Sequence, residues 1–167
     1  MRHTRFLLAA IASMAIATPA VAATTSAGTT VNIVRPVSIS KILDMDFGTL
    51  SFAGFSGTRA IVVSRTGALT CAADIVCTGV PKQARFNVQG TNKLVVNITY
   101  SGGTLAIPGA PPGAETIPFV ADGPASVTMI NSGAPGLNFD VGGTLTISPT
   151  LPGGVYTGTM NVTADYQ

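Results

Sequence analysis

The chain has 167 residues and a formal net charge of +2, and only 10% of its residues are charged while 46% are hydrophobic. Scattered Lys and Arg form no basic cluster in the sequence, which argues against a nucleic-acid or anionic-membrane partner. The single His is His3, so a chain that has lost its N-terminus has no Ser-His-Asp triad. We expect neither an enzyme nor a bound cofactor.

The N-terminus has the pattern of a secretory signal peptide over residues 1–22. Arg2 and Arg5 precede an apolar run, and Ala20-Val21-Ala22 matches a small-residue cleavage site. The apolar run, residues 6–17, is shorter than the roughly 20 residues that span a bilayer, and an uncleaved anchor is the alternative. Cleavage leaves 145 residues (167 minus 22) with seven basic residues (9 minus Arg2 and Arg5) against seven acidic ones. We therefore expect an exported domain of zero net charge with no membrane span.

Residues 23–34 form an N-terminal extension, and residues 35–167 form the domain. Ala, Thr, Ser and Gly make up most of the extension, which has little to bury by itself. Towards its end, Val31 and Ile33 alternate with polar neighbours, as in a strand. A flexible tail is the other interpretation.

Gly and Pro divide the rest of the chain into short segments rich in Val, Ile, Thr and aromatic residues, a pattern typical of strands. The spacing and alternation favour an all-β antiparallel sandwich, with a closed barrel as the alternative. We expect two hairpins, one of residues 84–89 with 94–100 and one of residues 144–148 with 155–166. The predicted strands are residues 31–39, 46–52, 59–64, 84–89, 94–100, 104–107, 116–120, 126–130, 144–148 and 155–166.

Cys71 and Cys77 are the only cysteines, and export into an oxidising compartment favours a disulfide between them. A metal site is the alternative, but two thiolates without a His in the mature chain fall short of the four ligands of structural zinc. Asp44 and Asp46 lie on one face of an extended segment, and we interpret them as solvated charges at a strand end rather than as a catalytic pair. We predict no metal site.

The C-terminal segment has the clearest pattern in the chain. From Tyr156 to Tyr166 every even position is apolar or small, and odd positions from Thr157 to Asp165 are polar, as in a strand with one buried face. A hydrophobic strand at the end of a chain has an edge that an earlier segment of the same chain or another molecule must cover. We expect this edge to determine the function.

Several motifs resemble those of known families. Leu43-Asp-Met-Asp-Phe47-Gly48, Ala84-Arg-Phe86-Asn-Val88-Gln-Gly90, Val141-Gly-Gly-Thr-Leu145 and Gly154-Val-Tyr-Thr-Gly158 resemble a family of small secreted bacterial domains of unassigned function, often regarded as pilin-like. A glycine fourteen residues from the end, Gly154, and a penultimate Tyr166 resemble the close of chaperone-usher pilins.

The resemblance implies an immunoglobulin-like sandwich that lacks its last strand, which a neighbouring subunit supplies by donor-strand complementation. It implies as partners copies of the chain or related subunits, a periplasmic chaperone and an outer-membrane usher. The groove edge would be Gly154, Tyr156, Met160, Val162, Ala164 and Tyr166, and the donated face Ala27, Thr29, Val31 and Ile33. The expected function is a structural subunit of a surface fibre or pilus that passes through the periplasm to the cell surface. A self-contained secreted or cell-surface sandwich that binds carbohydrate or another surface is the alternative.

Overall fold

The computed structural model describes residues 22–167, so all of the predicted signal peptide except Ala22 lies outside the described residues. The described residues divide into two units between residues 32 and 33. In the described part of the first unit no strand forms, and Val31 is 80% exposed. The predicted strand 31–39 is wrong over most of its length, because the first strand begins only at Ser38. Pro36, which has no N–H to donate to a ladder, lies just before it.

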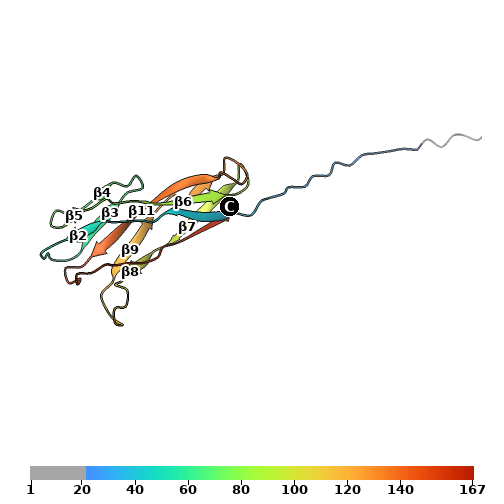
Figure 1. Ribbon diagram of the computed structural model, residues 1–167. Coiled ribbons are helices and arrows are strands. Elements are labelled where there is room, and N and C mark those ends of the chain that lie inside the picture. The colour runs from blue at the N-terminus through green and yellow to red at the C-terminus, as the bar shows by residue number, and fades with distance from the viewer. Residues whose placement is uncertain (1–21) are drawn as a thin grey trace, which may run out of the picture. The chain divides into compact units, whose positions relative to one another are not determined.

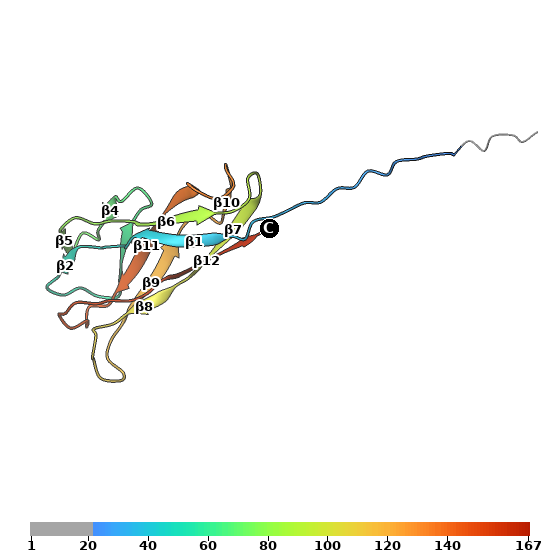
Figure 2. The ribbon, with the colours of Figure 1, turned by 45° about the vertical axis from the view of Figure 1, so that its right-hand side comes forward.

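The second unit is an antiparallel β structure (Figures 1 and 2). Residues 22–167 contain no helix, and therefore none long and apolar enough to cross a membrane. The strands in chain order are β1 (Ser38–Leu43), β2 (Thr49–Ser51), β3 (Arg59–Val63), β4 (Leu69–Thr70), β5 (Val76–Thr78), β6 (Ala84–Gln89), β7 (Val95–Ser101), β8 (Gly103–Leu105), β9 (Ile117–Asp122), β10 (Ser126–Thr128), β11 (Leu137–Ile147) and β12 (Asn161–Tyr166).

The larger sheet is organised around β11, which has eleven residues. Its first part pairs with β6, which pairs in turn with β1, and its second part pairs with β3 and β9. Gly142 and Gly143 lie where β11 changes partners. A Cβ atom at Gly142 would collide with the carbonyl oxygen of Val63, and one at Gly143 with the ring of Phe119. The close approach of β3 and β9 to β11 therefore requires glycine at both positions.

A smaller sheet, in the order β10-β7-β12, packs on the part of the large sheet formed by β1, β6 and β11. The core between them includes Phe86 stacked on Phe139, with ring centroids 5.7 Å apart, and Val96 and Ile98 from β7. The prediction of an antiparallel β-sandwich is thus confirmed.

Both predicted hairpins are wrong. Strand β6 lies in the large sheet while β7 lies in the small one, so the two strands face each other across the core. Strand β12 pairs with β7 and not with β11. An alternating apolar face is the same whether two successive strands lie side by side or in opposing sheets, so periodicity alone does not distinguish these arrangements.

A second apolar cluster fills the other end of the domain. Its buried members come from β3, β9 and β11 and from the loop before β5, and the short β2–β5 ladder covers it. Strands β4 and β5 were not predicted, since they have two and three residues respectively and flank the cysteine loop. The buried residues are Ile61, Ile75, Ile117, Phe119, Leu145 and Ile147.

Tyr100 provides a test of the sandwich. Its hydroxyl donates a hydrogen bond to the carbonyl of Pro124 at 2.9 Å, and burial raises its pKa to about 12. We expect Tyr100→Phe to lower the free energy of unfolding by about 1 kcal/mol in urea denaturation. Because the pKa is raised in the folded state, the Tyr100 contribution is complete below the ordinary value of 10.0 and is lost as the pH rises towards 12. Wild-type and Tyr100→Phe stabilities measured from pH 8 to 12 should therefore converge, and a constant difference would contradict this assignment.

Candidate functional site

Two strands at the border of the sandwich each have one hydrogen-bonded neighbour. Strand β12 pairs with β7 along its whole length, from Asn161 opposite Ser101 to Tyr166 opposite Val96. Strand β1 pairs with β6, and its ladder shifts register between Lys41 and Leu43. Within residues 22–167 the other edge of each strand has no hydrogen-bonded strand beside it. The two strands run next to each other along one flank of the domain (Figure 2).

A cavity of about 450 Å³, which we call the proximal cavity, opens between the end of β1 and the segment leading into β12. One wall is residues 41–45 and the other is residues 156–160. Its floor includes Phe86 and Phe119, which belong to the two core clusters. The aromatic interior of the sandwich is therefore reachable from outside at this point.

A second cavity of about 500 Å³, the distal cavity, continues from the first. Met45, Leu105 and Tyr156 line both cavities, so the two are neighbours, and we refer to them together as the groove. The distal walls are residues 45–52 and 151–156, and the floor includes side chains of β9 and β11. The groove thus separates the chain around β1 and β2 from the segment that precedes β12.

The chemistry of the groove is mostly apolar. Phe47, Leu50, Phe52, Ile117 and Leu145 give the distal cavity its branched and aromatic lining. At the proximal cavity a polar rim is added by Lys41, whose Nζ lies 2.6 Å from Oδ1 of Asp44. The two side chains are 57% and 79% exposed, so this ion pair contributes little stability. Such a surface suits an extended apolar chain rather than a polar substrate.

One wall of the groove needs glycine. A Cβ atom at Gly158 would lie 2.7 Å from the carbonyl oxygen of Thr104, so any side chain there would displace the backbone of β8. Two backbone hydrogen bonds between Ala106 and Thr157, of 2.8 and 2.9 Å, hold the same segment against the chain that follows β8. The wall before β12 is therefore fixed on its outer side, away from β1.

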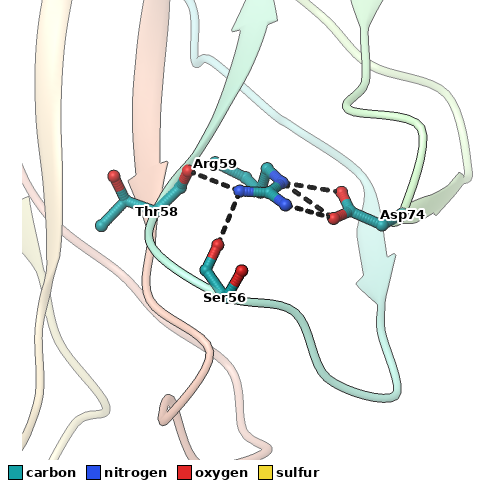
Figure 3. Close-up of polar contacts among 4 residues, drawn as sticks. All are labelled: Ser56, Thr58, Arg59 and Asp74. Atoms are coloured by element: carbon teal, nitrogen blue, oxygen red, sulfur yellow. Dashed lines mark hydrogen bonds and ion pairs between the residues drawn. The ribbon is translucent and has the colours of Figure 1, made fainter.

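The distal wall is held by an arginine clamp, drawn in Figure 3. The guanidinium of Arg59 donates to both carboxylate oxygens of Asp74 and to the carbonyls of Ser56 and Thr58, at 2.8 to 3.1 Å. It also lies over the ring of Phe55, 5.0 Å from the centroid. Hydrogen bonding from Arg59 lowers the pKa of Asp74, and the same bonds raise the pKa of Arg59.

The arginine clamp is connected to the groove through the loop between the two cysteines. Asp74 lies between Cys71 and Cys77, and the predicted disulfide between them is confirmed. Cys77 lies opposite Leu50 in the β2–β5 ladder, and Leu50 lines the distal cavity. The disulfide and the ion pair therefore support β5, which in turn holds β2 as a wall of the groove.

The structure brings three of the six predicted groove-edge residues to the cavities. Gly154 and Tyr156 line the distal cavity, and Tyr156 and Met160 line the proximal one. The other three, Val162, Ala164 and Tyr166, lie on β12 with half-buried side chains that pack on the first core cluster.

The predicted donor residues lie outside the strands. Ala27, Thr29 and Val31 are exposed and belong to the first compact unit, while Ile33, 80% exposed, begins the second. Among the described residues no three metal-ligating side chains gather, and Asp44 and Asp46 are exposed.

Sequence reasoning missed the opposite wall and the floor of the groove. The wall includes Leu43, Met45 and Phe47, whose period-two spacing was a readable signal of one apolar face. The floor residues Leu105, Ile117 and Leu145 come from three different strands, and no local pattern indicates that they meet.

Comparison with known proteins gives one match. A family model described as a domain of unknown function, DUF4402, matches residues 37–166. No curated protein and no solved structure matches the chain.

The arginine clamp can be tested with matched substitutions. Asp74→Asn leaves Arg59 without its carboxylate, and we expect Tm to fall by a few degrees at most at pH 7 and amide exchange to rise in residues 71–78. Because the pKa of Asp74 is lowered from 3.8 in the folded state, its stabilisation is present above that pH and is lost on acidification. The Tm difference should therefore vanish at low pH. Asp44→Asn, which breaks the exposed pair with Lys41, is the control and should change neither quantity.

Proposed function

This chain belongs to the DUF4402 family, and we propose that it is an exported, non-enzymatic structural subunit of a surface fibre or pilus, assembled by donor-strand complementation. The observation that carries the proposal is the groove itself, two neighbouring cavities of about 450 and 500 Å³ that open the core between the end of β1 and the chain before β12. In this proposal a strand from another chain fills the groove.

A strand fits this groove better than a compact ligand does. Its walls are two antiparallel border segments, and unpaired strand edges are templates for main-chain hydrogen bonds. One wall, residues 41–52, has twelve residues, which at 3.3 Å per residue corresponds to at most about 40 Å of extended chain. In strand addition the main chain gives affinity, and alternate side chains that enter pockets give specificity. The apolar floor would receive those side chains.

The candidate donor is the N-terminal extension of a neighbouring copy or a related subunit. Residues 23–33 have eleven residues, about 36 Å when extended, which matches the length of the groove. Ala27, Thr29, Val31 and Ile33 share one face of such a strand, and Val31 and Ile33 are each 80% exposed. Burial of these two branched side chains would add about 1.5 to 3 kcal/mol each.

The proposal has consequences for the partners of the chain. A subunit with an open apolar groove is prone to aggregate during export, so a periplasmic chaperone would cover the groove until assembly. An outer-membrane usher would then exchange the chaperone for the next subunit. The route is export through the periplasm to the cell surface.

A peptide complementation experiment tests the proposal. A synthetic peptide of residues 23–35 is added to the purified monomer, and unfolding is followed by differential scanning fluorimetry. We expect stabilisation that grows with peptide concentration and reaches about 2.7 kcal/mol at one hundred times Kd. The matched control is the same peptide with Val31→Asp and Ile33→Asp, which should give no stabilisation because charged side chains would enter the apolar floor.

Two outcomes would oppose the proposal. If the monomer has the same Tm with and without peptide and forms no multimers at high concentration, the self-contained binding module would replace the subunit. Equal stabilisation by the two peptides would place binding outside the groove.

A further inference from the structure

We propose that Tyr166 and Pro36 form an exit lock, which stops the N-terminal extension from turning back into the groove of its own domain and reserves it for a second copy of the chain. This inference rests on the proposed function, since it concerns which molecule supplies the strand.

In the lock, both the amide and the carbonyl group of Arg35 are hydrogen-bonded, at the point where the chain enters the domain. The Tyr166 hydroxyl donates a hydrogen bond to the carbonyl oxygen of Arg35 at 2.6 Å and accepts one from the Thr91 amide at 2.6 Å. The Arg35 amide donates to Oγ1 of Thr91 at 2.7 Å. The backbone at Arg35 is thus attached to β12 and to the turn after β6.

The fit around the hydroxyl is close. A Cβ atom at Gly90 would lie 2.8 Å from the Tyr166 oxygen, so a larger residue at this position would displace the ring. The glycine and the tyrosine together position the oxygen between the two backbone groups.

Pro36 completes the lock on the side of the domain. The ring of Pro36 fixes its own φ and disfavours the helical region for Arg35, so this dipeptide stays extended. A turn at residues 31–34 would contain Val31 and Ile33 and leave only residues 23–30, about 26 Å of extended chain, of which about 23 Å is needed to come level with Lys41. The two branched side chains can therefore return to the groove only if the turn forms within residues 34–37. With Arg35 held extended and both of its polar groups bonded, that turn is excluded.

Chain length alone would permit self-complementation. The groove begins level with Lys41, five residues after Pro36 and about 17 Å along an extended chain. Residues 23–34 span about 40 Å when extended, enough to reach the proximal cavity of the same domain after a reversal. Intramolecular insertion would have a high effective concentration and would compete with assembly. Because the lock prevents this reversal, it favours insertion of the N-terminal extension into the groove of another copy.

The location of the lock also gives assembly a direction. The chain enters the domain at the end where β12 finishes, whereas the distal cavity lies towards the opposite end, by β2 (Figure 2). Contact between the entry end of one copy and the groove of the next is heterologous, and a heterologous contact that does not close gives an open filament.

The test compares the wild-type chain with a released variant, Tyr166→Phe with Pro36→Gly. Both carry Ala27→Cys and Thr159→Cys, one on the extension and one on the proximal cavity, and are treated with a short bis-maleimide while the native disulfide stays oxidised. We expect wild type to give cross-links between copies. The released variant should show intrachain cross-links raised about tenfold, as expected for the loss of one or two hydrogen bonds, and a larger monomer fraction by light scattering.

Tyr100→Phe is the matched control, because it removes a hydroxyl-to-carbonyl hydrogen bond of similar length far from Arg35, and it should keep the wild-type pattern. If the double variant does not fold, Pro36→Gly alone, with Tyr166 intact, replaces it. We expect this single variant to raise the share of intrachain cross-links by a smaller factor. Intrachain cross-links already dominant in wild type, or an unchanged pattern in the released variants, would overturn the lock while leaving complementation in place. No cross-link in any variant would show that the extension never enters the groove and would refute both proposals.

Discussion

Main-chain pairing at the border of the sandwich is the constraint on which the rest of this structure depends. An antiparallel sheet satisfies its backbone groups from strand to strand, and each border leaves one row to water or to another chain. Here two borders, β1 and β12, lie beside each other on one flank without a ladder, and a groove opens between the end of β1 and the segment that leads into β12. The position of the proximal cavity follows from this missing pairing, and the distal cavity extends the opening towards β2.

Burial across the core reflects the same constraint. Ile61, Val63 and Val88 have no exposed surface, whereas Phe86 and Phe119, which form the floor of the proximal cavity, each retain 8% exposure. Two of the least completely buried core side chains thus line the proximal cavity, whereas Ile147, in the distal cavity, is only 1% exposed. Since each square ångström of apolar surface removed from water contributes about 25 cal/mol, an inserted strand would gain most where these rings are uncovered.

Few ion pairs form among the described residues, and they connect segments that lie side by side. Arg59 connects the loop before β3 to the cysteine loop, and Arg85 pairs with Asp140 across β6 and β11 at 2.7 Å. At the opposite end a neutral group, the Tyr166 hydroxyl, holds the entry of the chain. These polar contacts hold neighbouring segments of the backbone against each other. On the flank where β1 lies beside β12, the ion pair between Lys41 and Asp44 is exposed.

Local pattern was sufficient for the elements whose chemistry is local. Strand β6 has its predicted bounds because Ala84, Phe86 and Val88 alternate with polar residues, and the disulfide was predicted from the only two cysteines of a chain expected to be exported. Partner choice was decided by tertiary structure: β6 and β7 face each other, β12 joins β7, and β11 extends back to Leu137 through a pair of glycines. Alternation specifies which face of a strand is buried but not which strand covers it, since any apolar face can complete the same core. The sequence alone therefore determined a β domain with a half-buried strand close to its C-terminal end, whereas the groove exists only because folding brings the end of β1 beside the segment that leads into β12.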